Sequence, residues 1–271
     1  MWVYDRLTDR FRRDRPKNVG AITRNYALTL DDGRSDITLE RVFALIEGRT
    51  VGTMRKCIRW LPISDAERDD FSVYMAVFVT RVPGFTRWLT EMKKIDNELV
   101  ARPGRTTELW GSEPTPLEEV LRRDDRHAVE MFLKSCVEAE VPQNARLGAI
   151  VEAALQLARA FSEMNWLVVH PAFGPTFITT DNPFVFGTRA HTFPISSDCC
   201  ITMAGATDNT LAFEHALVDS KFVHRTNVVN ATLCDRFVLA RNEKYLARVV
   251  EEADIRGRGP RPMLKPWKTQ P

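Results

Sequence analysis

The sequence predicts an α+β fold in which a mainly helical N-terminal half packs on a small mixed or antiparallel sheet from the C-terminal half. Three observations support this prediction. Apolar residues recur at helical spacing through most of residues 36–164. Short β-branched and aromatic runs then follow one another at hairpin spacing over about residues 165–215. Helical spacing returns over residues 218–253.

These parts are expected to form one domain over residues 1–255. With 44% hydrophobic and 27% charged residues, the chain of 271 residues is an ordinary globular sequence that can bury a proper core. Helices followed by strands can also separate into two domains, but elements adjacent in sequence usually pack together. Residues 256–271 contain four prolines and few apolar side chains, so we predict a disordered tail.

The N-terminal elements follow from local patterns. Trp2–Asp5 and Phe11–Arg13 indicate a small hairpin. A first helix is expected from about Asp36 to Leu61, because its apolar residues fall on one stripe. After Pro62, the sequence Ser64-Asp-Ala-Glu67 has the form of a capping box that opens a second, deeply buried helix.

Further elements are expected downstream. Helices should begin near Thr115 and at Pro142, since proline is favoured in the first helical turn. The expected strands and final helices are Trp166–Val169, Phe193–Ser196, Cys200–Ala204, Leu211–Phe213, a long helix over Val218–Leu239 and a short one over Lys244–Ala253.

Composition and motifs exclude several classes of function. A net charge of +2 gives no general reason to expect binding to nucleic acid or an anionic membrane. The five cations of the tail could form a nucleic-acid arm, but a solvated tail is the simpler interpretation. No segment has the ~18 uncharged apolar residues of a membrane span, and the N-terminus lacks the pattern of a signal peptide. We therefore expect a cytoplasmic protein whose partner is a small molecule or another protein.

No cofactor or metal is predicted. The sequence contains no Gly-x-Gly-x-x-Gly, phosphate loop or Gly-x-Ser-x-Gly, and no His-x-x-His or Cys-x-x-Cys spacing. The five cysteines are odd in number and include the vicinal pair Cys199 and Cys200, which favours buried free thiols over a disulfide framework or a zinc site.

The candidate site is centred on the turn Asp181-Asn182-Pro183. An aspartate in a turn usually accepts from the backbone N–H two residues on, but Pro183 has no N–H. The Asp181 carboxylate must therefore bind the N–H of Phe184, water, a distant side chain or a ligand. Asn182 can still close an ordinary turn onto Phe184, so it fixes the corner while Asp181 is left comparatively free.

Three charged residues of the helical half could join Asp181. Glu40 and Glu47 stand seven residues apart on one edge of the first helix, which separates them by about 10 Å. They are either solvated or salt-bridged acids, or they reach toward a shared site. Arg81 ends the buried second helix, where it either pairs with the helix dipole or binds a buried carboxylate.

Two further residues are binding candidates. His170 directly follows a predicted strand and lies eleven residues before Asp181, so it could act with that carboxylate, although isolated loop histidines usually have no such role. Asn227 lies close to the buried side of the long C-terminal helix. A buried amide there needs a partner, because leaving it unpaired costs about 1–3 kcal/mol.

The stretch Phe177-Ile-Thr-Thr-Asp-Asn-Pro-Phe184 is similar to Phe-Ile-Thr-Ser-Asp-Asn-Pro-Val, the signature of a bacterial family known as domain of unknown function 4238. Phe193–Ser196 resembles its Pro-Leu-Ser. The helix of Glu40 and Glu47 resembles its Glu-rich helix, and Arg81 resembles the arginine of its Arg-x-Pro. The family usually begins with His-Tyr-Val-Pro, which this chain lacks. Three alternatives account for this: the start codon is misassigned, the gene of a relative is shortened, or the histidine is dispensable. The resemblance supplies candidate positions rather than a reaction.

Two hypotheses of different classes follow. The first is a ligand-binding or interaction protein in which the polar residues around the Asp-Asn-Pro corner form a buried network that fixes the packing of helices on the sheet. The alternative is a hydrolase or nuclease that uses Asp181 as base or metal ligand, with Glu40 or Glu47 in support and Arg81 holding an anionic group. In both, Asp181 is expected to face the N-terminal helices.

Overall fold

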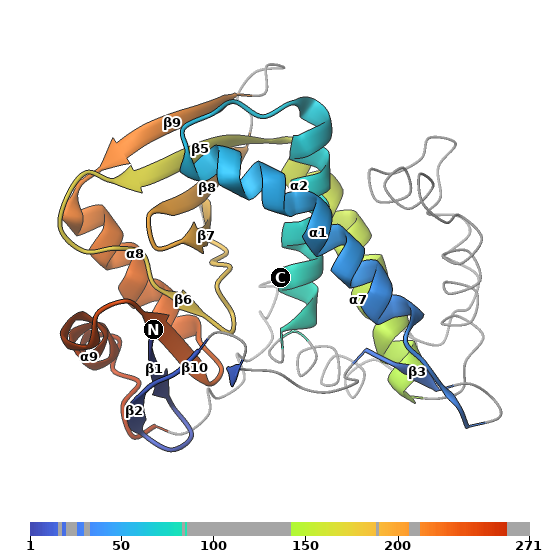
Figure 1. The fold of residues 1–271 in the computed structure, drawn as a ribbon, viewed down its shortest axis with the longest axis horizontal. Helices are drawn as coiled ribbons and strands as arrows, with labels where there is room; N and C mark the ends of the chain where they lie inside the picture. The colour runs from blue at the N-terminus through green and yellow to red at the C-terminus, as the bar shows by residue number, and fades with distance from the viewer. Residues whose placement is uncertain are drawn as a thin grey trace, which may run out of the picture.

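The α+β fold is confirmed by the computed structural model (Figure 1). The helical layer consists of α1 (Thr38–Ile58), α2 (Asp65–Arg81) and α7 (Pro142–Ser162). The helix expected near Thr115 lies outside the described residues, as does most of the predicted tail. The structure describes residues 1–15, 18–19, 26–29, 33–82, 85, 142–187, 190–205 and 212–258.

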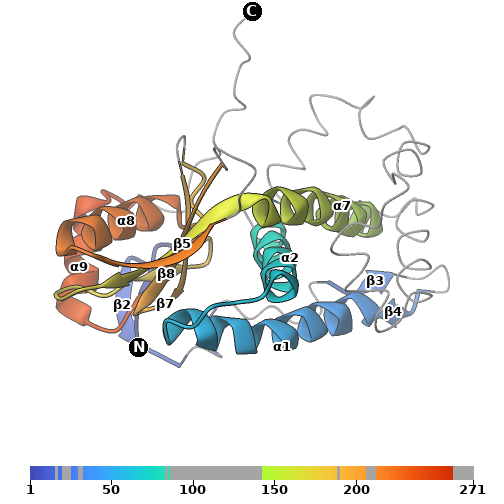
Figure 2. The same ribbon diagram turned by 90° about the horizontal axis from the view of Figure 1, so that it is seen from above.

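Helix α2 is the centre of the helical layer. It packs between α1 and α7 (Figure 2), and Phe71, Met75 and Ala76 on it are fully buried. The predicted capping box is present: Glu67 N donates to Ser64 Oγ at 3.3 Å, and Ser64 N donates to the Glu67 carboxylate at 2.9 Å. The box satisfies backbone N–H groups that the first turn of a helix leaves unpaired.

A mixed four-stranded sheet lies against these helices. Its strand order is β7-β8-β5-β9, with β5 and β9 parallel and the other neighbours antiparallel. Arg68 of α2 joins the helices to this sheet, since its guanidinium lies over the Trp166 ring at 4.8 Å and donates to the carbonyls of Met164 and Ala212. The strands are β5 (Met164–Pro171), β7 (His191–Ser196), β8 (Cys199–Gly205) and β9 (Phe213–Val218).

A second four-stranded sheet joins the two ends of the chain, in the order β2-β1-β10-β6. The predicted hairpin is present as β1 (Trp2–Asp5) and β2 (Arg10–Arg13). Strand β10 (Phe237–Ala240) pairs antiparallel with β1 and with the short β6 (Thr179–Thr180). The N-terminal hairpin therefore shares a sheet with the last strand of the chain.

Helices α8 (Ser220–Leu233) and α9 (Glu243–Glu252) pack beside this second sheet (Figure 1). The prediction of one helix over Val218–Leu239 was wrong, because α8 ends at Leu233 and Phe237 begins β10. Pairing of β10 with β1 at the far end of the chain overrides the local helical pattern there. A short ribbon of β3 (Leu28–Thr29) and β4 (Ser35–Asp36) precedes α1. Within the described part of the chain, no helix has the length and apolar character needed to cross a membrane.

Candidate functional site

Asp181 binds the turn between α8 and β10 through both carboxylate oxygens. Oδ1 accepts from the backbone N–H of Asp235 at 3.0 Å, and Oδ2 accepts from that of Arg236 at 2.7 Å. Its own N–H donates to the carbonyl of Phe237 at 3.2 Å. The distant partner that Pro183 obliges Asp181 to find is thus the backbone of residues 235 and 236.

Asn182 extends the same attachment. Its Nδ2 donates to the carbonyl of Leu233 at 3.3 Å, at the C-terminal end of α8, and its backbone N–H donates to Thr180 Oγ1 at 3.1 Å. The amide therefore satisfies a carbonyl that the last helical turn leaves unpaired. The expected turn onto Phe184 is replaced by this longer-range contact.

Two asparagines of α8 bind the other side of the segment before the corner. The fully buried Asn227 accepts from Ile178 N at 3.0 Å and donates to the Thr176 carbonyl at 2.9 Å and to Tyr245 Oη at 2.8 Å. Asn230 Oδ1 accepts from Thr180 Oγ1 at 2.9 Å. Asn227 thus has the partners its burial requires, and it links residues 176–178 to both C-terminal helices.

The environment of Asp181 makes its carboxyl group hard to ionise. Burial, followed by the nearby Asp235 carboxylate, raises its pKa from 3.8 to about 6, against the opposing effect of the backbone N–H groups. Cys234 lies close to the same carboxylate, and burial raises the pKa of its thiol to about 12. A carboxylate with a pKa near neutrality could in principle act as a base, but here both oxygens already accept hydrogen bonds.

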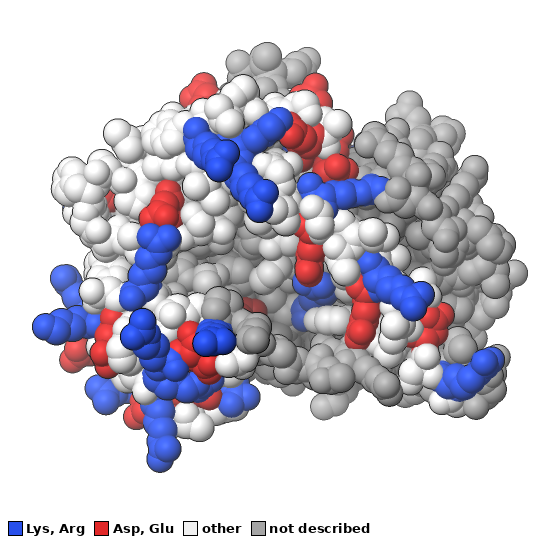
Figure 3. Space-filling view, viewed as in Figure 1, with Lys and Arg blue, Asp and Glu red and all other residues white. Residues whose placement is uncertain are grey.

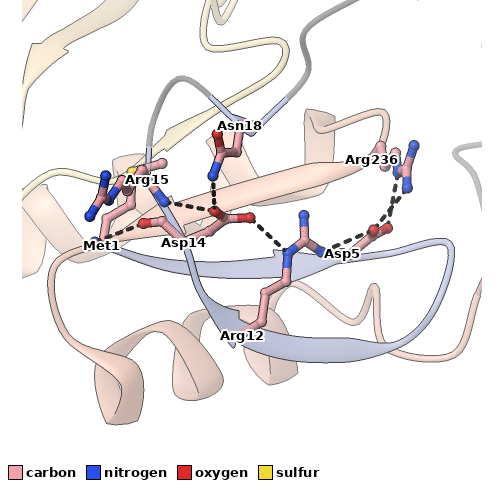
Figure 4. A network of polar contacts seen from close by, with 7 residues as sticks. All are labelled: Met1, Asp5, Arg12, Asp14, Arg15, Asn18 and Arg236. Atoms are coloured by element: carbon pink, nitrogen blue, oxygen red, sulfur yellow. Dashed lines mark hydrogen bonds and ion pairs between the residues drawn. The ribbon is translucent and has the colours of Figure 1, made fainter.

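Asp5 is a further buried carboxylate of this region, and it was not among the predicted site residues. It is 2% exposed and accepts from Arg236 at 3.1 and 3.0 Å and from Arg12 at 3.2 Å (Figure 4). Burial opposes ionisation of Asp5, but the contacts with Arg236, the Leu7 N–H and Arg12 together outweigh it and lower the pKa. Arg12 also binds Asp14, so one chain of polar contacts joins β1, β2 and the turn that Asp181 holds.

The other predicted charged residues lie together, but apart from these partners of Asp181. Arg81 Nη2 pairs with Glu47 Oε1 at 2.7 Å, and the guanidinium lies 4.9 Å from the centre of the Phe43 ring. Glu40 accepts from the N–H of Tyr26 at 3.4 Å. These contacts connect α1, α2 and the segment before α1. The hydrogen bonds of Asp181 lead instead to the α8–β10 turn. The structure therefore does not show the expected contact of Asp181 with the charged residues of the N-terminal helices.

His170 belongs to a different cluster, at the end of β5. Its Nδ1 contacts the Asp198 carbonyl at 3.1 Å, and its Nε2 contacts His215 Nδ1 at 3.1 Å. His215 Nε2 in turn lies 3.3 Å from the Leu61 carbonyl. The Trp60 indole stacks on the His170 ring, with centres 4.1 Å apart and an angle of 20°. Burial and then the neighbouring His215 lower the pKa of His170, which favours the neutral imidazole.

Trp60 reaches this position from a left-handed backbone conformation. It follows α1 with φ of +62°, while its N–H donates to the Cys57 carbonyl and that of Leu61 donates to the Lys56 carbonyl. This is the Schellman arrangement, whose left-handed residue is usually glycine. A tryptophan there is strained by about 1–2 kcal/mol, so other contacts must hold it in place.

An open pocket of about 350 Å³ lies beside this cluster. Trp60, Phe173 and Leu217 contribute large apolar side chains that are 44%, 69% and 64% exposed. Residues that line the pocket include Ile58, Trp60, His170, Phe173, Asp198 and Leu217. Sequence reasoning identified only His170 of this set. The sequence does contain one signal for Trp60: it is a large aromatic residue at the end of the first predicted helix, two residues before Pro62.

The described residues contain no group of three or more His, Cys, Asp and Glu side chains able to hold a metal ion. The fold and these two regions define the class: an α+β protein with a hydrogen-bonded Asp-Asn-Pro corner and an aromatic pocket at the edge of its mixed sheet. The chain belongs to the family described as "Protein of unknown function (DUF4238)", whose model matches residues 1–244. Comparison with curated proteins and with solved structures gives no match.

Proposed function

We propose that this protein is a non-catalytic binding protein and that the pocket beside Trp60 takes a small molecule. One observation carries the proposal: a tryptophan in a strained backbone conformation forms a wall of an open pocket while it stacks on the buried His170. Strained residues persist only where surrounding contacts hold them, and they concentrate at binding sites. Small-molecule sites usually combine aromatic and apolar walls with a few polar groups, and this pocket has both kinds of side chain in its lining.

The Asp-Asn-Pro corner then has a structural role. Asp181, Asn182 and Asn227 use their polar atoms on backbone groups of other elements, which supports the hypothesis of a polar network that fixes packing. The hydrolase or nuclease alternative needs Asp181, Glu40 or Glu47, and Arg81 to converge. Arg81 and Glu47 do pair, but Asp181 binds the α8–β10 turn instead, so the geometry favours binding over catalysis.

The surface and the thiols bear on partners and location. On the face seen in Figure 3, basic and acidic side chains are intermingled rather than gathered into a broad basic region, which favours a small-molecule partner over nucleic acid. Cys57, Cys199, Cys200 and Cys234 are free and buried, as suits the reducing cytoplasm.

The proposal is tested with N-phenyl-1-naphthylamine, a neutral aromatic probe that fluoresces in apolar sites. We expect saturable fluorescence with the wild-type chain and at least fivefold weaker binding to Trp60→Gly and Phe173→Ala. Leu7→Ala serves as the control, because it removes an exposed apolar side chain from the β1–β2 turn. Equal binding to all four proteins would place the probe elsewhere and refute the pocket.

A further inference from the structure

We infer that the Trp60 pocket takes an organic ammonium cation, an inference that rests on the proposed function and names its ligand class. Among the described lining residues, Asp198 is the only Asp, Glu, Lys or Arg, so a carboxylate is the one acidic or strongly basic group there. The same pocket exposes Trp60 and Phe173. Aromatic ring faces attract cations, most strongly that of tryptophan. A carboxylate beside exposed aromatic rings therefore matches a ligand with a positive, partly apolar head.

The imidazoles favour a cation over an anion or a metal. Both nitrogens of His170 are engaged, one with the Asp198 carbonyl and one with His215. His215 is engaged on both sides as well, with His170 and the Leu61 carbonyl. Every ring nitrogen therefore faces another protein atom at 3.1–3.3 Å, so neither ring directs an N–H at an anionic ligand or an unobstructed lone pair at a metal ion.

The three contacts of this pair bear on its charge. Two neutral imidazoles carry two protons in total, whereas the three contacts from the Asp198 carbonyl to the Leu61 carbonyl would require three. In the neutral pair one contact lacks a proton, and His215–Leu61 is the longest at 3.3 Å. Burial lowers the pKa of His170, so the imidazole on which Trp60 stacks most closely favours the neutral form and does not repel a bound cation.

Asp198 is paired with Arg241, and this pair gives the inference a direct test. Arg241 binds the carboxylate at 3.2 and 3.0 Å, with the two side chains 65% and 50% exposed. An exposed pair of this kind is weak, so an ammonium ion can share the carboxylate. Removing Arg241 should strengthen the binding of a cation, whereas it should weaken the binding of an anion.

The experiment compares choline with 3,3-dimethylbutan-1-ol, a neutral molecule of nearly the same shape, by titration calorimetry at constant ionic strength. We expect choline to bind about tenfold more tightly than the alcohol, as one cation–π contact and a carboxylate would give. Asp198→Asn should reduce that preference to the part that the aromatic rings supply, while it keeps the backbone carbonyl that His170 contacts. Arg241→Gln should raise the affinity for choline severalfold. Melting temperatures of both variants verify that they are folded.

Two results would overturn the inference. One is equal binding of choline and the alcohol, and the other is weaker choline binding by Arg241→Gln. If N-phenyl-1-naphthylamine still binds in a Trp60-dependent manner, either result removes the cation and leaves the pocket intact. If the dye binding also fails, the proposed function fails with it.

Discussion

Asp181 anchors the α8–β10 turn with a carboxylate that accepts two consecutive backbone N–H groups. Burial and Asp235 nevertheless raise the pKa of this carboxyl group to about 6, so the ionised form is costly in the folded state. Cys234 and Arg236 lie close enough to interact electrostatically with the Asp181 carboxylate. Asp181 therefore affects the free energy of unfolding in two ways, through its hydrogen bonds and through the cost of ionising its carboxyl group. Measurements at two pH values separate these effects.

The first prediction concerns Asp181→Asn. A carboxamide turns an N–H₂ group toward one of the two N–H donors, so we expect the free energy of unfolding at pH 7.5 to fall by about 1–3 kcal/mol. Asp198→Asn should cost at most about 1 kcal/mol, because it alters only exposed contacts, with Arg241 and with Ser197 Oγ. Urea unfolding of the three proteins measures both differences. A loss as small as that of Asp198→Asn would refute the anchoring role.

The pH dependence of the same variant has a definite sign. A raised folded-state pKa means that the associated stability is fully present below 3.8 and is lost as the pH rises through about 6. The wild-type chain should therefore exceed Asp181→Asn in stability by more at pH 4.5 than at pH 7.5. Because other titrating groups are common to both proteins, they cancel in the difference. A smaller gap at pH 4.5 would mean that the backbone N–H groups outweigh burial and lower this pKa.

At the scale of elements, the turn between α1 and α2 connects the helical layer to the pocket. The Schellman arrangement places Trp60 at a left-handed position, and its indole lies over His170 and His215 at 4.1 and 5.3 Å. Stacking of this kind contributes about 0.5–1.5 kcal/mol, which offsets the backbone strain. The strained backbone at Trp60 therefore lowers local stability, but it places the indole where it lines the pocket.

The second prediction separates strain from stacking at residue 60. Trp60→Ala and Trp60→Gly both lose the ring, but glycine adopts the left-handed conformation without strain. The glycine variant should therefore be more stable than the alanine variant by about 1 kcal/mol. At the neighbouring Leu61, whose φ is not positive, glycine should instead be less stable than alanine by about 0.5–1 kcal/mol. Thermal unfolding of the four variants measures this reversal, and the same order at both positions would contradict it.

The elements themselves were predictable wherever the signal was local. Helix α2 follows from a capping box and a continuous apolar stretch, and both occur within the segment that folds. Strand β10 was missed because its identity depends on β1, more than 230 residues earlier in the chain. Likewise, Pro183 showed that Asp181 lacks a local partner, but no pattern near residue 181 could indicate a bond to the backbone of residues 235 and 236. Trp60 and His215 meet His170 only through the packing of α1 on the sheet.

At the scale of the whole molecule, the two ends of the chain close one sheet while the middle forms the helical layer and the mixed sheet. The second sheet has its own apolar cluster, which includes Tyr4, Val238 and Leu246. It is joined to the rest through the segment 176–182 that Asn227 and Asp181 hold. Our expectation of one domain over residues 1–255 requires that these two parts unfold together.

The third prediction tests that requirement with Leu246→Ala in α9. Leu246 is fully buried in the second sheet's cluster, so its truncation should cost about 2–4 kcal/mol. In a single cooperative unit this loss also lowers the hydrogen-exchange protection of β5 and β8. These two strands pair with each other in the mixed sheet, not in the sheet beside α9. Glu251→Ala, on the exposed side of the same helix, should change both measurements by less than about 0.5 kcal/mol. If protection falls in β1 and β10 but stays unchanged in β5 and β8, the chain consists of two independently unfolding units, and the polar corner links them without coupling their stabilities.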